Sequence, residues 1–158
     1  MNQLFRVILL FYFISHIPIT LCVDLQVLFG EFYPDSLQNL NNWYIATYKD
    51  FVIRDKPLWL QSFIWCELFL QMPFFFIATY GLLFKKNFIR IPSIFYGVHV
   101  ATTVVPILAE TLLNDVNTFN EKLMLSGFYL PYLLIPLSLA LYMAAVDTPF
   151  PDKKPKKI

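Results

Sequence analysis

Polar and ionisable side chains recur at helical spacing inside two otherwise apolar runs of this sequence. His16, Thr20 and Asp24 follow one another at every fourth position, so on an α-helix they share one face. Glu67 and Gln71 repeat this spacing in the second run. An ionisable side chain at membrane depth is costly and therefore indicates a functional site with a partner nearby. We expect Asp24 and Glu67 to be partners.

Two carboxylic acids that meet in an apolar cavity cannot easily both ionise, so we expect Asp24 and Glu67 to hold one proton between them near neutrality. A protonated lipophilic amine that enters between them would lose its water but gain a charged partner. Neighbouring Phe and Tyr rings would add cation–π contacts. The alternative is that each acid serves only as an interhelical hydrogen-bonding group or extends to water.

The composition is that of a membrane protein. The chain has 158 residues, of which 58% are hydrophobic and only 15% charged, and its mean hydropathy is +0.57. A soluble domain carries about 25% charged residues. The basic residues form short clusters that do not indicate nucleic-acid binding. Phosphate-loop, nucleophile and metal-ligand spacings are lacking, so we expect no cofactor and no metal, and Cys22 and Cys66 as apolar fillers.

Four apolar runs are each long enough to cross a bilayer as a helix, which takes about 20 residues. They cover residues 4–29, 59–84, 92–113 and 123–145. We therefore expect an all-α, four-helix transmembrane bundle over residues 1–146 and a basic tail over residues 147–158. The first run could instead be a cleaved signal peptide, but it is longer than a typical signal core and contains His16, Pro18 and Asp24.

The segment between the first two runs, residues 30–58, is polar and aromatic. Its apolar residues predict a short amphipathic helix that caps the bundle, with Trp43 and Tyr44 at the headgroup level. Every run also contains proline, which frees a backbone carbonyl and bends a helix. These prolines predict a bent bundle that leaves a pocket, and they are Pro18, Pro73, Pro106, Pro131 and Pro136.

Four spans place both termini on one side of the membrane. The larger share of the basic residues falls on that side: Arg6, Lys85, Lys86, Arg90, Lys153, Lys154, Lys156 and Lys157. The opposite side has Lys49, Arg54, Lys56 and Lys122. Because positive residues are concentrated in cytoplasmic loops, we expect both termini to be cytoplasmic.

Several short motifs resemble one known family in order along nearly the whole chain. They include SHIPITL at residues 15–21, DLQ at 24–26, CEL at 66–68, QMPFF at 71–75, IATY at 77–80 and YLPYLLIP at 129–136. On these motifs the chain resembles the EXPERA family, and in particular its receptor branch. The resemblance implies a four-helix protein of the endoplasmic reticulum membrane with a lipid-facing cavity for sterols and lipophilic amines.

The resemblance also implies roles for particular residues. Asp24 resembles the carboxylate that pairs with a ligand amine, and Glu67 resembles its neighbouring protonated acid. Asp50 resembles an acid needed for ligand binding, through the lumenal loop rather than by touching ligand. Thr103 and Tyr132 resemble pocket-lining positions. From their spacing, we add His16, Thr20 and Gln71 as candidate ligand-binding residues.

The partners implied by the resemblance are cholesterol or an oxysterol, lipophilic cationic amines, membrane lipid, a second copy of the chain, and the Niemann–Pick type C cholesterol transporter. The nuclear envelope and endolysosomal membranes are further implied locations. Lys154 and Lys156 are the fifth and third residues counted back from the end of the printed sequence, in a pattern that resembles a dilysine retrieval signal. Such a signal requires a cytoplasmic tail.

Three functions remain open from the sequence. The first is a receptor that binds sterols and amines without turnover and regulates cholesterol homeostasis and trafficking. The second is a sterol isomerase that shifts a Δ8 double bond to Δ7, with Glu67 and either His16 or His99 as acid and base. The third is a passive scaffold for a transporter, for which changes in the loops would matter and changes in the pocket would not.

Overall fold

The computed structural model describes residues 1–151, and the regular elements within them are all helical. Four helical segments are long and apolar enough to span a membrane: Gln3–Phe32, Leu58–Leu83, Asn87–Leu113 and Phe119–Ala145. The predicted all-α bundle is therefore confirmed. The predicted retrieval signal, Lys154 and Lys156, lies outside the described residues.

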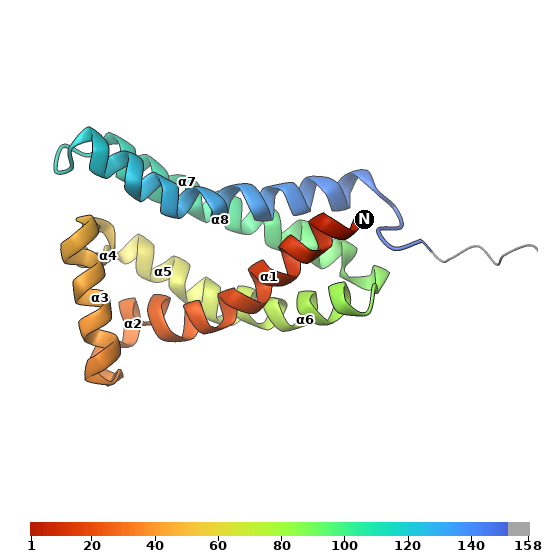
Figure 1. Cartoon of the computed structure of the whole chain (residues 1–158), viewed down its shortest axis with the longest axis horizontal. Coiled ribbons are helices and arrows are strands. Elements are labelled where there is room, and N and C mark those ends of the chain that lie inside the picture. The colour runs from red at the N-terminus through yellow and green to blue at the C-terminus, as the bar shows by residue number, and fades with distance from the viewer. Residues whose placement is uncertain (152–158) are drawn as a thin grey trace, which may run out of the picture.

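Two of the spans are interrupted helices and two are continuous (Figure 1). The first consists of α1 (Gln3–Ile19), a π-helical turn (Thr20–Asp24), α2 (Gln26–Phe29) and a 3-10 turn (Gly30–Phe32). The second consists of α5 (Leu58–Cys66), a π-helical turn (Glu67–Gln71) and α6 (Met72–Leu83). A 3-10 turn (Asn87–Ile89) leads into α7 (Arg90–Leu113), and α8 (Phe119–Ala145) follows.

The two π-helical turns contain the acids singled out in the sequence. Asp24 ends the first turn and Glu67 begins the second. Each turn has a proline within two residues of it, Pro18 before the first and Pro73 after the second, and a proline removes one rung of the regular hydrogen-bond ladder. The single α-helical face expected for His16, Thr20 and Asp24 is interrupted after Ile19, where the π-helical turn begins. Single π turns inside α-helices are frequent at functional sites.

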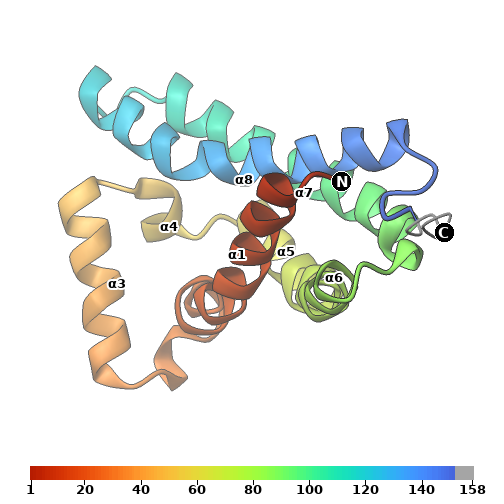
Figure 2. The ribbon, with the colours of Figure 1, turned by 45° about the vertical axis from the view of Figure 1, so that its right-hand side comes forward.

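A helical cap covers the end of the bundle opposite the termini (Figures 1 and 2). It consists of two helices, α3 (Asp35–Tyr48) and α4 (Phe51–Asp55), where the sequence predicted one. The helix ends between them because Lys49 adopts a left-handed conformation, with φ 57°. Asp50 then begins α4 by accepting a hydrogen bond from the Ile53 amide at 3.1 Å.

The fourth span begins earlier than the predicted residue 123. Thr118 and Glu121 form a capping box, in which each side chain satisfies a backbone amide of the other residue. Polar residues that looked like a loop are thus the first turn of α8. The turn before it is joined to the cap, because the Asn117 side chain donates to the Lys49 carbonyl at 3.0 Å.

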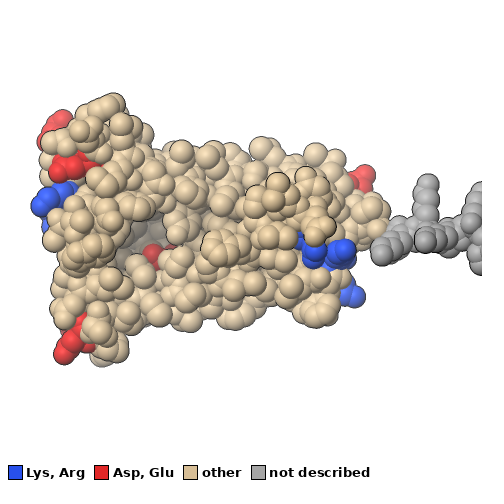
Figure 3. All heavy atoms as spheres, viewed as in Figure 1, with Lys and Arg blue, Asp and Glu red and all other residues tan. Residues whose placement is uncertain are grey.

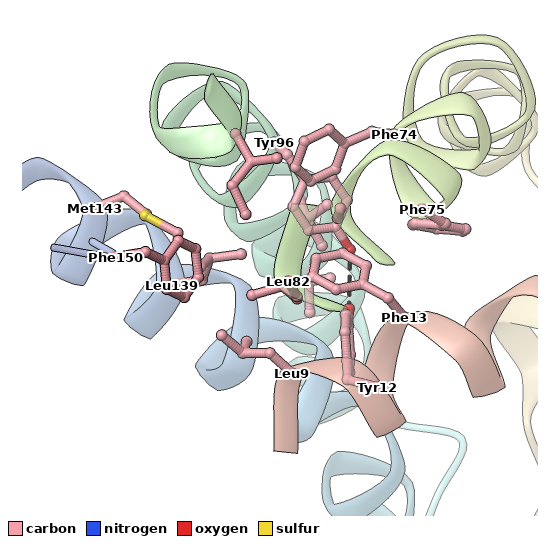
Figure 4. Packing of buried hydrophobic residues seen from close by; sticks show 14 of the residues in the cluster. Leu9, Tyr12, Phe13, Phe74, Phe75, Leu82, Tyr96, Leu139, Met143 and Phe150 are labelled. Atoms are coloured by element: carbon pink, nitrogen blue, oxygen red, sulfur yellow. Dashed lines mark hydrogen bonds between the residues drawn. The ribbon is translucent and has the colours of Figure 1, made fainter. Parts of the chain in front are cut away.

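The core consists of two hydrophobic clusters at different heights in the bundle. The first, towards the termini, includes Leu9, Phe13, Phe75, Leu139 and Met143, all of them 0–1% exposed (Figure 4). The second lies below the cap and is built from Leu25, Val27, Phe51, Val52, Leu60 and Ile64. The first helix, α1, contributes Leu9, Tyr12 and Phe13 to the centre of the first cluster.

The pair α7–α8 makes the most extensive contact between elements. Gly97 allows this close approach, since a Cβ built there would lie 2.2 Å from the Pro136 carbonyl oxygen and 2.7 Å from the Ala140 Cβ. The two long helices thus form one wall of the bundle, against which α1, α5 and α6 are arranged (Figure 1).

Candidate functional site

A cavity of about 270 Å³ lies between the two hydrophobic clusters. Residues from all four spans and from the cap line it. Its wall is largely apolar, with side chains such as Ile19, Leu60, Phe63, Val100 and Ile107. A hollow on the molecular surface, with an acidic residue visible inside it, is seen in Figure 3. An apolar cavity with a few convergent polar groups is the usual form of a small-molecule site.

The acids predicted to be partners do meet in this cavity. A carboxylate oxygen of Asp24, one of Glu67 and an imidazole nitrogen of His16 all lie within 4.8 Å of one another. Glu67 is 9% exposed, and it accepts a hydrogen bond from the hydroxyl of Thr20, which is fully buried. The two π-helical turns therefore bring the acids of the first and second spans together.

His16 is held by aromatic rings rather than by a carboxylate. It is 7% exposed, and its ring centroid lies 4.9 Å from those of Tyr12 and Phe75 and 4.8 Å from that of Tyr132. Among residues 1–151 its imidazole makes no hydrogen bond to another protein group. His16 therefore presents an unpaired polar edge close to the two acids.

The other predicted site residues fall into two groups. Gln71, Thr103 and Tyr132 line the cavity, as do His16, Asp24 and Glu67. Thr20 and Asp50 do not line it, and each instead bonds to residues that do. His99, the alternative acid–base residue, is also absent from the wall, and its Nε2 is buried without a partner among the described residues.

Asp50 joins the cap to α8. Its side chain is 1% exposed and accepts hydrogen bonds from the hydroxyls of Tyr129 at 2.6 Å and Tyr44 at 3.0 Å. Burial raises the pKa of the Tyr44 hydroxyl, and the neighbouring Asp50 carboxylate raises that pKa further, so Tyr44 remains a donor. Tyr44 and Tyr129 both line the cavity. Asp50 thus holds two residues of the cavity wall although it does not line the cavity itself.

The sequence did not indicate three polar residues of the cavity wall, which are Asn41, Tyr44 and Tyr129. Asn41 and Tyr44 are three residues apart in the cap and so share a face of α3. Tyr129 is likewise one turn before Tyr132 in α8. Tyr129 could have been predicted from its helical spacing to Tyr132. Asn41 and Tyr44 could not, because the face of α3 that is turned to the cavity depends on the left-handed turn at Lys49.

The arrangement suits a ligand with one positive charge and a large apolar body. A carboxylate in an apolar cavity lacks water to stabilise its charge, so a desolvated ammonium group is its natural counter-ion. Tyr132 and Phe63, also in the wall, offer aromatic faces for cation–π and apolar contacts. The fully apolar part of the wall can receive fused hydrocarbon rings.

Comparison with known proteins supports the family resemblance seen in the sequence. The chain is 46% identical to sigma intracellular receptor 2 of Homo sapiens over 145 residues, 84% of this chain and 82% of the receptor. It is 44% identical to sigma intracellular receptor 2 of Xenopus tropicalis over 152 residues, 89% and 88% of the two chains. It is also 33% identical to efficient mitochondria targeting-associated protein 19 of Schizosaccharomyces pombe over 138 residues, 84% and 71%.

The profile of the EXPERA (EXPanded EBP superfamily) family matches residues 36–143. That match begins in the cap helix α3 and runs through the second, third and fourth spans. With well over half of the sequence matched and relatives similar along most of their lengths, the chain belongs to the EXPERA family.

Proposed function

We propose that this protein is an intracellular membrane receptor that binds sterols and lipophilic amines in the acidic cavity. The meeting of Asp24 and Glu67 with His16 in an apolar wall supports the proposal. The similarity to proteins named sigma intracellular receptor 2 adds to it. The ammonium group of an amine would pair with Asp24, while Glu67, held by Thr20, would carry the shared proton.

The size of the cavity suggests how a sterol would lie. Ligand pockets usually enclose roughly 300–1,000 Å³, and this cavity encloses about 270 Å³. The fused rings would occupy the cavity, with the sterol hydroxyl near the polar groups, and the alkyl tail would extend through the surface opening into lipid. The receptor would lie in the endoplasmic reticulum membrane and regulate cholesterol homeostasis and trafficking. Its partners would be a second copy of the chain and a cholesterol transporter.

A sterol Δ8–Δ7 isomerase is the second candidate, and the proximity of His16 to both acids favours it. Double-bond migration requires protonation of one carbon and proton removal from another, and the cavity contains groups able to do both. In that case an amine would bind because its charge imitates the carbocation intermediate.

Incubation of the purified protein with a Δ8-sterol, followed by mass spectrometry of the recovered sterol, separates the two candidates. Sterol that is recovered bound and unchanged supports the receptor. A Δ7 product that disappears with Glu67→Gln overturns the receptor and supports the isomerase. Glu31→Gln, a change at an exposed acid outside this cavity, is the matched control.

A further inference from the structure

A second pocket lies at the end of the bundle that carries the two termini, far along the spans from the cap. It encloses about 340 Å³ and is lined by Gln3 and Arg6 of α1, Lys85 of the α6–α7 turn, and Phe150 and Pro151 after α8. Basic side chains gather at this end of the molecule in Figure 3. The residues named here belong to three separate parts of the chain, so folding of the bundle builds the pocket.

The pocket wall is held in place by hydrogen bonds. Asn87 donates to the Phe150 carbonyl at 3.0 Å and accepts from the Phe150 amide at 2.9 Å, which fixes the segment after α8. Phe150 itself is 8% exposed and packs into the first hydrophobic cluster. Arg6 donates to the Leu82 carbonyl at 3.2 Å, near the end of α6. This hydrogen bond orients the guanidinium of Arg6 and uses one of its five N–H donors, so the other N–H groups are available to a ligand.

The charge of this pocket is not balanced by acids within the described part of the chain. The ion pairs there are Arg54–Asp55 and Arg90–Asp147, so neither Arg6 nor Lys85 has a carboxylate partner in residues 1–151. No acidic residue is in the pocket wall. Arg90, by contrast, is already engaged by the Met143 and Val146 carbonyls and by Asp147.

The position of the pocket relative to the membrane identifies the anion. Arg6 is the fourth residue of the first span, and Lys85 follows the last residue of the second span by two positions. Both charges therefore lie near the boundary between hydrocarbon and headgroups. Leu4 in α1, Leu83 at the end of α6 and Phe84 directly after it are 50–71% exposed, so they present an apolar surface to acyl chains.

We propose that this pocket binds the phosphate of an anionic phospholipid headgroup, with the acyl chains along α1 and α6. Basic pockets between membrane helices bind such headgroups, because the phosphate is attracted by Arg and Lys while the chains remain in the bilayer. Arg6 would hold the phosphate with its oriented fork, and Lys85 would contribute a second charge. A zwitterionic headgroup would bind less well, because its own cation meets a positive pocket.

Native mass spectrometry of the full chain with mixed phosphatidic acid and phosphatidylcholine tests the proposal. Each basic residue near a membrane surface contributes about fivefold to the affinity for anionic lipid. We expect Arg6→Gln with Lys85→Gln to lower the preference for phosphatidic acid by about 25-fold. The matched control, Arg54→Gln with Lys122→Gln, removes one arginine and one lysine at the opposite end and should preserve the preference. The tail lysines are unchanged in both double variants. Any difference in lipid preference between the two variants is therefore due to the pocket residues.

Three outcomes would overturn the proposal: equal binding of the two lipids by the wild type, an unchanged preference in the pocket double variant, and displacement of the lipid by millimolar inorganic phosphate. The last outcome would mean that the site takes the free anion. Lys85→Gln alone guards against misfolding, because the Lys85 side chain makes no hydrogen bond within residues 1–151. Arg6→Lys retains the charge and should retain most of the lipid preference.

Discussion

The Asp24–Glu67 pair shows how a few polar residues can define a site inside an apolar bundle. Helical spacing placed His16 and Asp24 on one face, and the cost of an unpaired acid in a membrane-spanning helix suggested Glu67 as the partner of Asp24. Their actual meeting depends on two π-helical turns that spacing did not predict. Hydropathy does not distinguish a π turn from an α turn, so this local rotation was accessible only from the structure.

Asp50→Asn should weaken the junction between the cap and α8. The buried Asp50 carboxylate accepts from two tyrosine hydroxyls and one amide, and hydrogen bonds to a charged group contribute about 1.5–3 kcal/mol. We therefore expect the free energy of unfolding to fall by about that amount and hydrogen exchange to increase in α3 and α4. Asp115→Asn, an exposed acid in the α7–α8 turn, is the control. Unchanged exchange in Asp50→Asn would contradict the proposed junction.

Alkaline pH should loosen the same junction through Tyr44. Burial first, and the Asp50 carboxylate second, raise the pKa of Tyr44 in the folded state above its unfolded value of about 10. A raised tyrosine pKa means that the folded state holds the proton more tightly. Its stabilising contribution is therefore complete below about pH 10 and is lost as the pH rises beyond that value. The midpoint temperature of thermal unfolding should fall more steeply above pH 10 for the wild type than for Tyr44→Phe. Equal pH dependence of the two midpoints would refute this role of Tyr44.

Among the elements, α7 and α8 are the continuous spans, and π-helical turns interrupt the other two spans. The sequence correctly indicated four spans. It also predicted a bend at each proline, but α7 continues through Pro106 and α8 continues through Pro131 and Pro136. It misplaced the start of α8 because Glu121, a polar capping residue, resembles a loop residue until its partner Thr118 is considered. It also missed the division of the cap, because a left-handed lysine at position 49 has no simple sequence signal.

Gly97→Ala should destabilise the α7–α8 wall. The added Cβ would lie 2.2 Å from a backbone oxygen of Pro136, so the helices must move apart. Overpacking of this kind costs about 1–3 kcal/mol. Gly127→Ala, also within the pair, is the matched control because a Cβ there meets nothing within 4 Å. Removal of a helical glycine should make this control neutral or slightly more stable in thermal unfolding. Equal effects of the two changes would show that close approach is not the cause.

At the scale of the whole molecule, the bundle has a cap at one end, the basic pocket at the other, and the acidic cavity in its interior below the cap. The two sites carry opposite charge, so they are expected to select different ligands. Met1 and Pro151, the two ends of the described residues, both lie at the basic end (Figure 1). This common end is what four spans require, and the asymmetry of basic residues between the two ends predicts which side it faces.

Both termini should face the cytoplasm, because Arg6, Lys85, Lys86 and Arg90 gather at their end. An epitope tag before Met1 should be digested by protease added to intact microsomes, whereas a tag inserted in the exposed α7–α8 turn at Asp115 should be protected. Detergent should expose both tags equally. The reverse pattern would contradict the predicted orientation and, with it, a cytoplasmic role for Lys154 and Lys156.

The most direct test of the acidic cavity is equilibrium binding of a lipophilic tertiary amine and of its uncharged carbon isostere to the same purified protein. Loss of one partner from a buried charged pair costs at least about 2 kcal/mol, so Asp24→Asn should weaken amine binding at least about 30-fold. Binding of the neutral isostere should change little, because it depends on the apolar wall. Amine binding that survives Asp24→Asn, or equal losses for the two ligands, would show that the carboxylate is not the amine's partner and would contradict the account.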